Sequence, residues 1–597
     1  MLEYAAPVRD MQFVIGEMIG YERVAALAGC EEVNAELVDA VLEEAAKFAA
    51  GVLAPLNRVG DTEGCRLDGD VVHTPAGWRE AYAGFCEAGW PSLAMNPEFG
   101  GQGLPKLVAT AVSEMWDSAN MAFGLCPLLT NGAIEAIEQH GDDTLRERYL
   151  AKLVAGEWTG TMNLTEPQAG SDLALVRTRA EPQPDGTYRV FGTKIFITYG
   201  EHDMADNIVH LVLARVQGAP EGVKGISLFV VPKFMVGKDG ALGDRNDVYC
   251  VSIEHKMGIK ASPTAVLQFG DHGGAVGYLV GEENRGLEYM FIMMNAARYA
   301  VGVQGIAVSD RAYQKAVAYA KERVQSRPVD GSVKGSATII HHPDVRRMLM
   351  TMRALTEGCR AMATAAAAAY DAAHHHPDPA VREQNQAFYE FMVPLVKGYS
   401  TESSLEVTNL GVQVHGGMGF IEETGAAQYY RDAKILTIYE GTTAIQANDL
   451  VGRKTTRDGG QAAKAIAAQV EKTEQALAAS GSADAKAVAG HLAEARQAFL
   501  DVVGFMVENG KADPNAAYAG SVPYLMLTGN LVAGWQLGRS LLAAEQALKA
   551  GQDQAFMQAK IATARFYAEH ILTRARATRD AIVGGAQSVM ALPMDAF

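Results

Sequence analysis

A short stretch near residue 440 contains the side chains with the clearest chemical potential in this sequence of 597 residues. Residues 413–446 combine a glycine-rich turn, HGGMG, with an arginine–aspartate pair and a Glu-Gly-Thr step that begins at Glu440. Glu440 precedes a predicted helix start, where Thr443 and Gln446 fit a Thr-x-x-Gln capping box. A carboxylate at such a junction lies beside exposed backbone N–H groups, which suits a base that takes a proton next to a carbonyl group. The alternative is a helix-terminal glutamate that complements the helix dipole.

A second group of small polar residues lies in the segment TMNLTEPQAGSD, residues 161–172. Thr165, Ser171 and the amides around Gly170 supply hydrogen-bond donors with little steric bulk. These donors suit a flat ring with polar edges or a phosphate group. Gly-Ser-Asp is also ordinary turn chemistry, so this segment alone decides nothing.

The segment GTKIFIT follows about twenty residues later and has the composition of a strand. Because side chains alternate between the two faces of a strand, Lys194, Phe196 and Thr198 are expected on one face, with Ile195 and Ile197 in the core. An aromatic ring and a hydroxyl on the same face could receive a flat heterocycle.

Length and composition set limits on the class of protein. A chain of 597 residues exceeds one hydrophobic core and is expected to divide into several packed units. A net charge of −18 argues against sequence-independent binding of nucleic acid, which depends on lysine and arginine. The six cysteines form no CxxC motif, so neither a zinc site nor a disulfide framework is expected. The His374–His376 run is interpreted as a solvated turn and not as a metal site.

The hydrophobic patterns indicate an α+β multidomain protein. Residues up to about 156 have a helical pattern, and β-branched runs typical of a small antiparallel barrel or sandwich follow. Helical periodicity returns from about residue 283, and the polar stretch Arg453–Gln461 is interpreted as a linker to a final helical segment. Strands are expected at Tyr188–Phe191, Lys194–Thr198, Asn207–Val216, Gly225–Pro232 and Ala265–Phe269. Val522–Gly538 is expected to be a buried helix, since it is short for a membrane span.

The motifs in this order resemble the acyl-CoA dehydrogenase family over about residues 40–452. The matching segments are TEPQAGSD, GTKIFIT, Arg323 with Gln325, QVHGGMG, YYRDAKI and IYEGT. Residues after 462 resemble the extra helical domain of the larger members. The first forty residues, FITYGEHD and EHKMGIK look most like the 3-methylmercaptopropionyl-CoA dehydrogenases and related large bacterial enzymes.

This resemblance implies the acyl-CoA dehydrogenase fold: an N-terminal helical domain, a middle β-barrel domain and a helical bundle, with an additional C-terminal helical domain. The expected division is an N-terminal extension (1–40), a helical domain (41–156), a β domain (157–283), a bundle carrying the catalytic glutamate (284–452) and the added domain (453–597). FAD is the implied cofactor, and an acyl-CoA is the implied substrate.

The resemblance also implies roles for individual residues. Glu440 is the implied catalytic base. Ser171, Arg298 and Gly441 are implied to contact the acyl-CoA. Arg323, Gln413 and Gly417 match positions that hold the pyrophosphate and ribityl-adenosine part of FAD, usually in the neighbouring subunit. The full set of implied cofactor contacts is Met162, Leu164, Thr165, Ser171, Phe196, Thr198, Arg323, Gln413, Gly417 and Thr442.

Several residues depart from the family pattern. Phe196 replaces the usual flavin-facing tryptophan and removes an indole donor, and Tyr199 replaces an asparagine. Ser326 replaces an aromatic residue, which puts one contact on the adenine side in doubt, and Ala444 replaces a more usual polar residue. Some relatives place the base directly before the arginine that matches Arg298. That position is Ala297 here, so the resemblance assigns the base to Glu440.

The implied reaction is α,β-dehydrogenation of an acyl-CoA to the trans-2-enoyl-CoA, with electrons passed to an electron-transfer flavoprotein. The substrate is either a fatty acyl-CoA or 3-methylthiopropanoyl-CoA. The alternatives are an acyl-CoA oxidase on the same fold and a flavin-depleted scaffold relative. The N-terminus shows no secretory signal, and a cytoplasmic homodimer without an integral membrane segment is expected.

Overall fold

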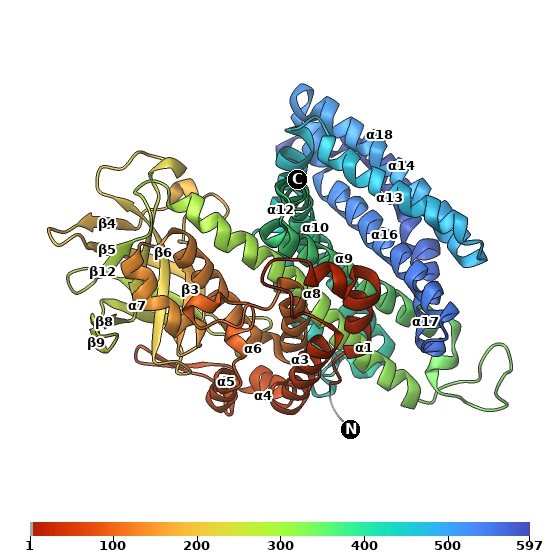
Figure 1. The fold of residues 1–597 in the computed structure, drawn as a ribbon, viewed down its shortest axis with the longest axis horizontal. Helices are drawn as coiled ribbons and strands as arrows, with labels where there is room; N and C mark the ends of the chain where they lie inside the picture. The colour runs from red at the N-terminus through yellow and green to blue at the C-terminus, as the bar shows by residue number, and fades with distance from the viewer. Residues whose placement is uncertain (1–3) are drawn as a thin grey trace. The chain divides into compact units, whose positions relative to one another are not determined.

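The computed structural model describes residues 4–597, which form two compact units. Unit 1 contains Lys47–Leu104 and Ala119–Ala297. Unit 2 contains Tyr4–Ala46, Pro105–Ser118 and Arg298–Phe597. Two long helices, α6 (Lys106–His140) and α8 (Gly286–Glu322), contribute residues to both units. The order of helices, strands and further helices agrees with the expected acyl-CoA dehydrogenase fold (Figure 1).

Unit 1 is built on an eight-stranded sheet. Seven strands follow the order β10-β11-β5-β12-β7-β6-β3, and β4 pairs with β5 and β6. The strands are β3 (Trp158–Asn163), β4 (Arg179–Pro182), β5 (Tyr188–Thr198), β6 (Asn207–Val216), β7 (Ser227–Pro232), β10 (Val248–Ile253), β11 (Thr264–Phe269) and β12 (Ala275–Leu279). Two short hairpins, β1–β2 (Arg66–Asp68, Val71–His73) and β8–β9 (Phe234–Val236, Leu242–Arg245), complete the β structure.

The expected β domain is present, but its pairing is not purely antiparallel. Strand β6 pairs in parallel with both β3 and β4, so the predicted antiparallel arrangement is wrong at these two pairs. Every residue of β3 is buried, which is why its sequence lacks the alternation that marks a half-exposed strand. The two predicted strands at 188–191 and 194–198 form one continuous strand, β5.

The sheet of unit 1 is covered by apolar residues on both faces. One core cluster joins β3, β6 and β7 to α7 (Asp143–Val154) and to the parts of α6 and α8 that lie in unit 1. A second cluster is formed mainly by β5, β6, β7, β10 and β11. The other helical elements of unit 1 are η2 (Ala49–Leu53), α4 (Ala54–Glu63), α5 (Trp78–Glu87), η3 (Trp90–Ser92), η4 (Pro97–Phe99), η5 (Leu173–Leu175) and η6 (Val223–Gly225).

Unit 2 is helical throughout. Its N-terminal helices are α1 (Val8–Gln12), η1 (Phe13–Ile19), α2 (Tyr21–Ala25) and α3 (Ala35–Phe48). Its central helices are η7 (Ile339–His341), α9 (Pro343–His375), α10 (Pro379–His415), η8 (Gly416–Phe420), η9 (Glu422–Thr424), α11 (Ala426–Lys434), η10 (Ile435–Thr437), α12 (Thr443–Val451) and η11 (Gly452–Thr456). The last group is α13 (Gln461–Ser480), α14 (Ala483–Ala512), α15 (Pro514–Ala519), α16 (Ser521–Lys549), α17 (Gln554–Tyr567), η12 (Ala568–Leu572), α18 (Arg574–Val589) and η13 (Met594–Ala596).

The added helices pack through α16, as its apolar composition predicts. Leu525, Leu531 and Leu537 of α16 are fully or almost fully buried. Gly529 lies so close to the Tyr399 ring of α10 that an added Cβ would be 2.2 Å from it. The expected polar linker at 453–461 is only partly irregular. Its first residues continue η11, where buried Thr455 pairs with the Tyr524 hydroxyl at 2.9 Å.

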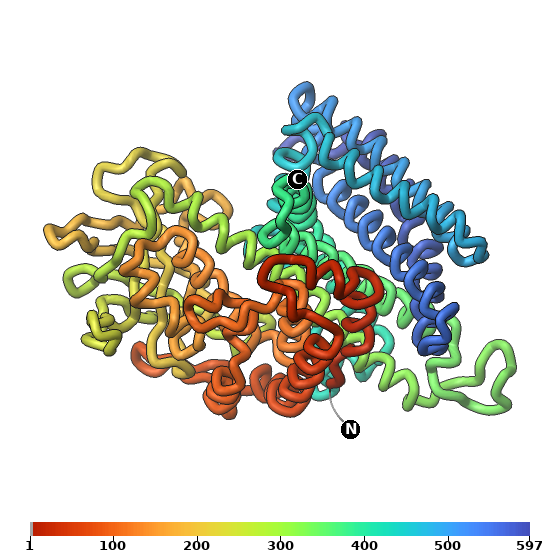
Figure 2. Tube along the Cα trace, in the orientation of Figure 1, coloured from red at the N-terminus to blue at the C-terminus, as the bar shows by residue number. Residues whose placement is uncertain are grey.

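The segment between α8 and α9 loops away from the helices of unit 2 (light green in Figure 2). Its base is closed by a bridge between Val324 and Thr338, and the Gln325 N–H donates to the Ala337 carbonyl at 3.0 Å. Val329 in this loop is 84% exposed, so the loop contributes little to the core of unit 2. Among residues 4–597, one helix (α8) is long and apolar enough to cross a membrane, and 67% of its most apolar window is buried.

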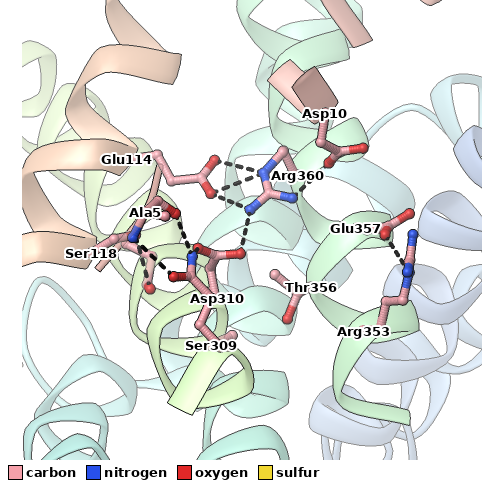
Figure 3. A network of polar contacts seen from close by, with 12 residues as sticks. Ala5, Asp10, Glu114, Ser118, Ser309, Asp310, Arg353, Thr356, Glu357 and Arg360 are labelled. Carbon is pink, nitrogen blue, oxygen red and sulfur yellow. Dashed lines mark hydrogen bonds and ion pairs between the residues drawn. The ribbon is translucent and has the colours of Figure 1, made fainter. Parts of the chain in front are cut away.

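A buried network of charged side chains joins distant parts of unit 2 (Figure 3). Arg360 of α9 donates to Glu114 of α6 and Asp10 of α1, each at 2.6 Å, and to Asp310 of α8 at 3.2 Å. Lys560 of α17 donates to the other Asp10 oxygen at 2.5 Å. Burial raises the pKa of Glu114 to about 7 although Arg360 opposes this. Burial also disfavours ionised Asp10, but Lys560 and Arg360 hold its pKa below the usual range.

We expect Arg360→Leu to lower the free energy of unfolding by about 3–5 kcal/mol, because three buried carboxylates lose their shared cation. The control is Arg347→Ala, which removes an exposed ion pair with Asp344 and is expected to cost less than about 1 kcal/mol. Denaturant unfolding followed by circular dichroism measures both values. Equal losses in the two variants would contradict a structural role for the network.

Candidate active site

Glu440 lies in a tight turn between η10 and α12 in unit 2. Glu440 and the next residue, Gly441, both adopt left-handed backbone conformations, with φ of 56° and 87°. The preceding residue, Tyr439, is held by a hydrogen bond that its hydroxyl donates to Gln304 Oε1 at 2.5 Å. A left-handed glutamate is strained by roughly 1–2 kcal/mol, and such strain concentrates at functional sites.

The cap of α12 differs from the predicted capping box by one residue. The helix begins at Thr443, and the Thr442 hydroxyl accepts the Ile445 N–H at 3.3 Å. The Thr443 hydroxyl instead donates to Glu402 Oε1 at 2.6 Å. The Gln446 side chain reaches back to the turn, but its Nε2 donates to carbonyl groups, and its Oε1 does not accept the backbone N–H expected in a capping box. Thr442 is therefore the N-cap, and the capping box predicted at Thr443 is wrong by one residue.

The carbonyl groups of the turn are held from inside unit 2. Gln446 Nε2 donates to the Glu440 and Gly441 carbonyls at 3.3 and 3.2 Å. Lys397 Nζ of α10 donates to the same Gly441 carbonyl at 2.7 Å. Within residues 4–597, the Glu440 N–H has no hydrogen-bond acceptor. The turn thus uses its carbonyls internally and leaves an amide donor beside the Glu440 carboxylate.

The Glu440 carboxylate lies in an electrostatic setting suited to a base. Burial raises its pKa to about 7, while Arg298 and Lys397 favour the ionised form. Burial lowers the pKa of Arg298, and the negative charges of Asp449 and Glu440 oppose this decrease. Burial also lowers the pKa of Lys397 to about 8, opposed by Glu440. A carboxyl group with a pKa near 7 can accept a proton at neutral pH and retain it.

Lys397 is the residue of this site that the sequence analysis missed. It interrupts an otherwise uncharged run, FMVPLVKGYS, and its side chain is fully buried in α10. A lysine in a buried helical run is rare unless a partner compensates its charge. That pattern is the signal in the sequence that could have identified it.

Three further candidate residues of unit 2 are exposed to solvent. Gln413 lies near the end of α10, and Gly417 follows in η8. An added Cβ on Gly417 would meet no atom within 4 Å, so the backbone here is open to a ligand. Arg323 follows α8, and its guanidinium has no ion-pair partner among residues 4–597. An unpaired guanidinium and an open glycine turn fit a phosphate-bearing group.

Most of the candidate residues of unit 1 are arranged around β3 and β5. Met162 is on β3, and the Thr165 carbonyl accepts the Ile195 N–H of β5 at 3.0 Å. Leu164 is joined to β5 through its carbonyl, which accepts from Lys194 Nζ at 2.9 Å. Ser171 is exposed in the following turn. These two hydrogen bonds join the segment after β3 to β5 and so bring the two motifs of unit 1 together.

The expected common face of Lys194, Phe196 and Thr198 is wrong. Lys194 is fully buried and pairs with Glu166 at 2.8 Å, whereas the Phe196 side chain is 58% exposed. The β5–β11 register shifts between the pairs Leu267–Lys194 and Ala265–Ile197, and Phe196 takes a left-handed φ of 59°. This bulge breaks the alternation of the strand and presents the Phe196 ring outward. Ile197 is buried as expected, but Ile195 is only partly buried.

No cluster of three or more histidine, cysteine or acidic residues able to hold a metal ion occurs in residues 4–597. His374 and His375 belong to the last turn of α9, not to a loop. All six cysteines are free thiols.

Four family models match the chain in sequence order. They describe the acyl-CoA dehydrogenase N-terminal domain (residues 36–157), middle domain (161–272) and C-terminal domain (284–454), and an acetyl-CoA dehydrogenase C-terminal-like domain (463–593).

Individual relatives match over nearly the full length. The chain is 56% identical to a 3-methylmercaptopropionyl-CoA dehydrogenase from Ruegeria pomeroyi, covering 99% of both chains. It is 36% identical to a broad-specificity linear acyl-CoA dehydrogenase from Mycobacterium tuberculosis, covering 100% of both. Its fold is similar to that of an acyl-CoA dehydrogenase from Bacillus anthracis complexed with FAD, with a TM-score of 0.74, 22% identity, and coverage of 96% and 92%.

We expect Phe196→Gly to raise the free energy of unfolding of the protein by about 1 kcal/mol, since glycine adopts a positive φ without strain and the lost ring is largely exposed. The control is Ile197→Gly, which removes a buried side chain from the next position and is expected to destabilise. Thermal unfolding of the ligand-free protein measures both. A clear loss of stability in Phe196→Gly would show that the exposed ring supports the fold.

Proposed function

Because the chain belongs to the acyl-CoA dehydrogenase family and is therefore an oxidoreductase, we propose that it converts an acyl-CoA thioester to the trans-2-enoyl-CoA. The observation that carries this proposal is the Glu440 turn, which combines a carboxyl group whose pKa is raised to about 7 with an adjacent free amide donor.

Glu440 is the proposed base for the α-proton of the substrate. The C–H bond breaks as its proton moves to a Glu440 carboxylate oxygen, and negative charge develops on the thioester oxygen. A donor at that oxygen stabilises the charge by about 3 kcal/mol, and the free Glu440 N–H is the proposed protein donor. Hydride leaves the β-carbon at the same time, so the product has a carbon–carbon double bond.

FAD is the proposed cofactor and supplies the hydride acceptor when it is bound. The residues of unit 1 proposed to receive the flavin are Met162, Leu164, Thr165, Ser171, Phe196 and Thr198. The exposed Phe196 ring supports this assignment, because a flat apolar surface offers stacking to a flat heterocycle. In unit 2, Arg323, Gln413, Gly417 and Thr442 are the proposed contacts, and unpaired Arg323 suits the pyrophosphate.

Ser171, Arg298 and Gly441 are the proposed contacts to the acyl-CoA. The high identity to the Ruegeria pomeroyi enzyme favours 3-methylthiopropanoyl-CoA as the substrate. A fatty acyl-CoA is the second candidate, favoured by the similarity to the broad-specificity linear acyl-CoA dehydrogenase. An anaerobic panel of acyl-CoAs, with flavin bleaching as the readout, separates the two. Peroxide formation in air would instead indicate an oxidase, and protein purified without flavin would favour a scaffold role.

The remaining expectations are also proposals. Electrons pass to an electron-transfer flavoprotein, and the protein is a cytoplasmic homodimer. Its proposed domains are residues 41–156, 157–283, 284–452 and 453–597, after an N-terminal extension of 1–40. The burial of α16 within unit 2 supports a structural role for the last domain.

We expect Glu440→Gln to retain FAD and acyl-CoA binding but to lose nearly all anaerobic flavin reduction, because it lacks a proton acceptor. In the unsubstituted protein, reduction should fall as the pH drops below about 7, since Glu440 must be ionised to act. Stopped-flow absorbance measures both effects. Glu402→Gln, which removes a nearby carboxylate, is expected to keep the reaction. Rapid bleaching of Glu440→Gln would refute the assignment of the base.

We expect Arg323→Ala to weaken FAD retention more than acyl-CoA affinity, since a guanidinium paired with pyrophosphate acts on the cofactor. Flavin content after dilution and gel filtration measures this loss. Arg347→Ala, another exposed arginine of unit 2, is the control and should retain FAD. Full flavin occupancy in Arg323→Ala would remove this residue from the proposed cofactor site.

A further inference from the structure

Lys397 is a buried cation, and within residues 4–597 its ammonium group makes a single hydrogen bond, to the turn that carries Glu440. Its side chain is fully buried in α10, and Nζ donates to the Gly441 carbonyl at 2.7 Å. No carboxylate among residues 4–597 lies within ion-pairing distance of this ammonium group. Burying an ammonium group without an ion-pair partner is costly, so its retention requires a compensating interaction.

The Gly441 carbonyl does not need a lysine for its hydrogen bonding. Gln446 Nε2 already donates to it at 3.2 Å and to the Glu440 carbonyl at 3.3 Å. Any second neutral donor would complete the satisfaction of this carbonyl. Compared with Gln446, Lys397 adds a shorter hydrogen bond and a positive charge. Both are directed at the turn in which Glu440 and Gly441 have left-handed backbones.

The direction of the carbonyls determines where the amides of this turn point. A peptide group is planar, so holding the carbonyls of residues 440 and 441 in place also orients the N–H groups of the same peptides. The Glu440 N–H itself remains without an acceptor. The Lys397 contact therefore acts on the Gly441–Thr442 peptide, the second peptide after the base, and a change in the Gly441 φ or ψ would move the backbone that carries the Glu440 side chain.

We propose that Lys397 is a positioning residue for the dehydrogenation: its ammonium group fixes the Glu440–Gly441 turn and places a positive charge beside the catalytic carboxylate. This inference rests on the proposed function of Glu440. It assigns Lys397 no contact with substrate or cofactor, and the lysine acts through the Gly441 carbonyl and through its charge.

Several charged groups face this pair, and they set the direction of the expected effect. Arg298 of α8 is the other cation that favours ionised Glu440, and Asp449 of α12 partly offsets it. Arg453 in turn pairs with Asp449 at 3.4 Å. On α10, Glu402 lies in the field of Lys397. Removing the Lys397 charge leaves burial opposed mainly by Arg298, so the pKa of Glu440 should rise further.

The expected consequence appears as a shift in pH dependence. Lys397→Met removes the charge and the donor but keeps much of the side-chain volume. Below the pKa of the base, the ionised fraction falls about tenfold for each unit by which that pKa rises. We expect the acid limb of flavin reduction to move to higher pH in Lys397→Met, with reduction roughly tenfold slower at pH 6 and a smaller loss at pH 9. Lys397→Arg, which keeps the charge, should restore most of the limb position.

The control is Thr401→Val, one turn further along α10. The Thr401 hydroxyl is buried and donates to the Lys397 carbonyl at 2.7 Å, so this variant disturbs the same helix without touching the turn. We expect this variant to lose thermal stability but to keep the acid limb of flavin reduction at the pH found for the unsubstituted protein. An equal displacement of the limb in Thr401→Val and Lys397→Met would reduce Lys397 to a structural role and overturn the proposal.

A second readout does not depend on turnover. Difference infrared spectroscopy can titrate the Glu440 carboxyl in substrate-free protein, with Glu440→Gln as the blank. A higher pKa in Lys397→Met than in Lys397→Arg supports the proposal, and identical titrations overturn it. If Lys397→Met does not fold, Lys397→Gln takes its place in both measurements. If no acyl-CoA reduces the unsubstituted protein, the proposed function fails, while the infrared titration still tests the effect of Lys397 on Glu440.

Discussion

The site depends on partly withdrawing one carboxylate from water without neutralising it permanently. Glu440 is withdrawn from solvent far enough to raise its pKa to about 7, and two buried cations limit that rise. Full burial without Arg298 and Lys397 would leave a protonated acid that could not act as a base. A fully solvated carboxylate would ionise readily but would bind a proton too weakly at neutral pH. The helices of unit 2 hold Arg298 and Lys397 where they keep the pKa of Glu440 between these two extremes.

The same physical problem recurs in the network around Arg360, with a different outcome. There, the carboxylates accept short hydrogen bonds directly from Arg360 or Lys560, so the acidic and the basic groups are both fully engaged in ion pairs. At the Glu440 turn, the cations act across space and the carboxylate makes no hydrogen bond within residues 4–597. A carboxylate that must exchange a proton has to stay unbonded, whereas one that supports a fold is best bonded completely. Bonding pattern, more than burial, therefore distinguishes the two clusters.

The sequence predicts elements that depend on local patterns and fails where geometry depends on tertiary contacts. The helical periodicity from about residue 283 follows from spacing alone, and the long helices α8, α9 and α10 are present there. The capping box failed by one residue because Thr442 and Thr443 are equally good caps, and only the fold brings Glu402 to the second hydroxyl. Phe196 was placed on the wrong face because a register shift leaves no mark in the residue types. Lys397 was missed because its partner is a backbone carbonyl 44 residues away.

The Asp10–Lys560 contact has a consequence for synthesis of the chain. Asp10 leaves the ribosome 550 residues before Lys560 does. Unit 1 is complete in sequence by Ala297, so it can fold while much of unit 2 has yet to be made. The segment Tyr4–Ala46 belongs to unit 2 and cannot pack until its partners have been made. Its buried apolar residues Phe13 and Val14, for example, pack against the C-terminal helices. Tyr4–Ala46 is thus translated long before the helices it packs against, and in that interval its apolar residues are open to chaperones and proteases.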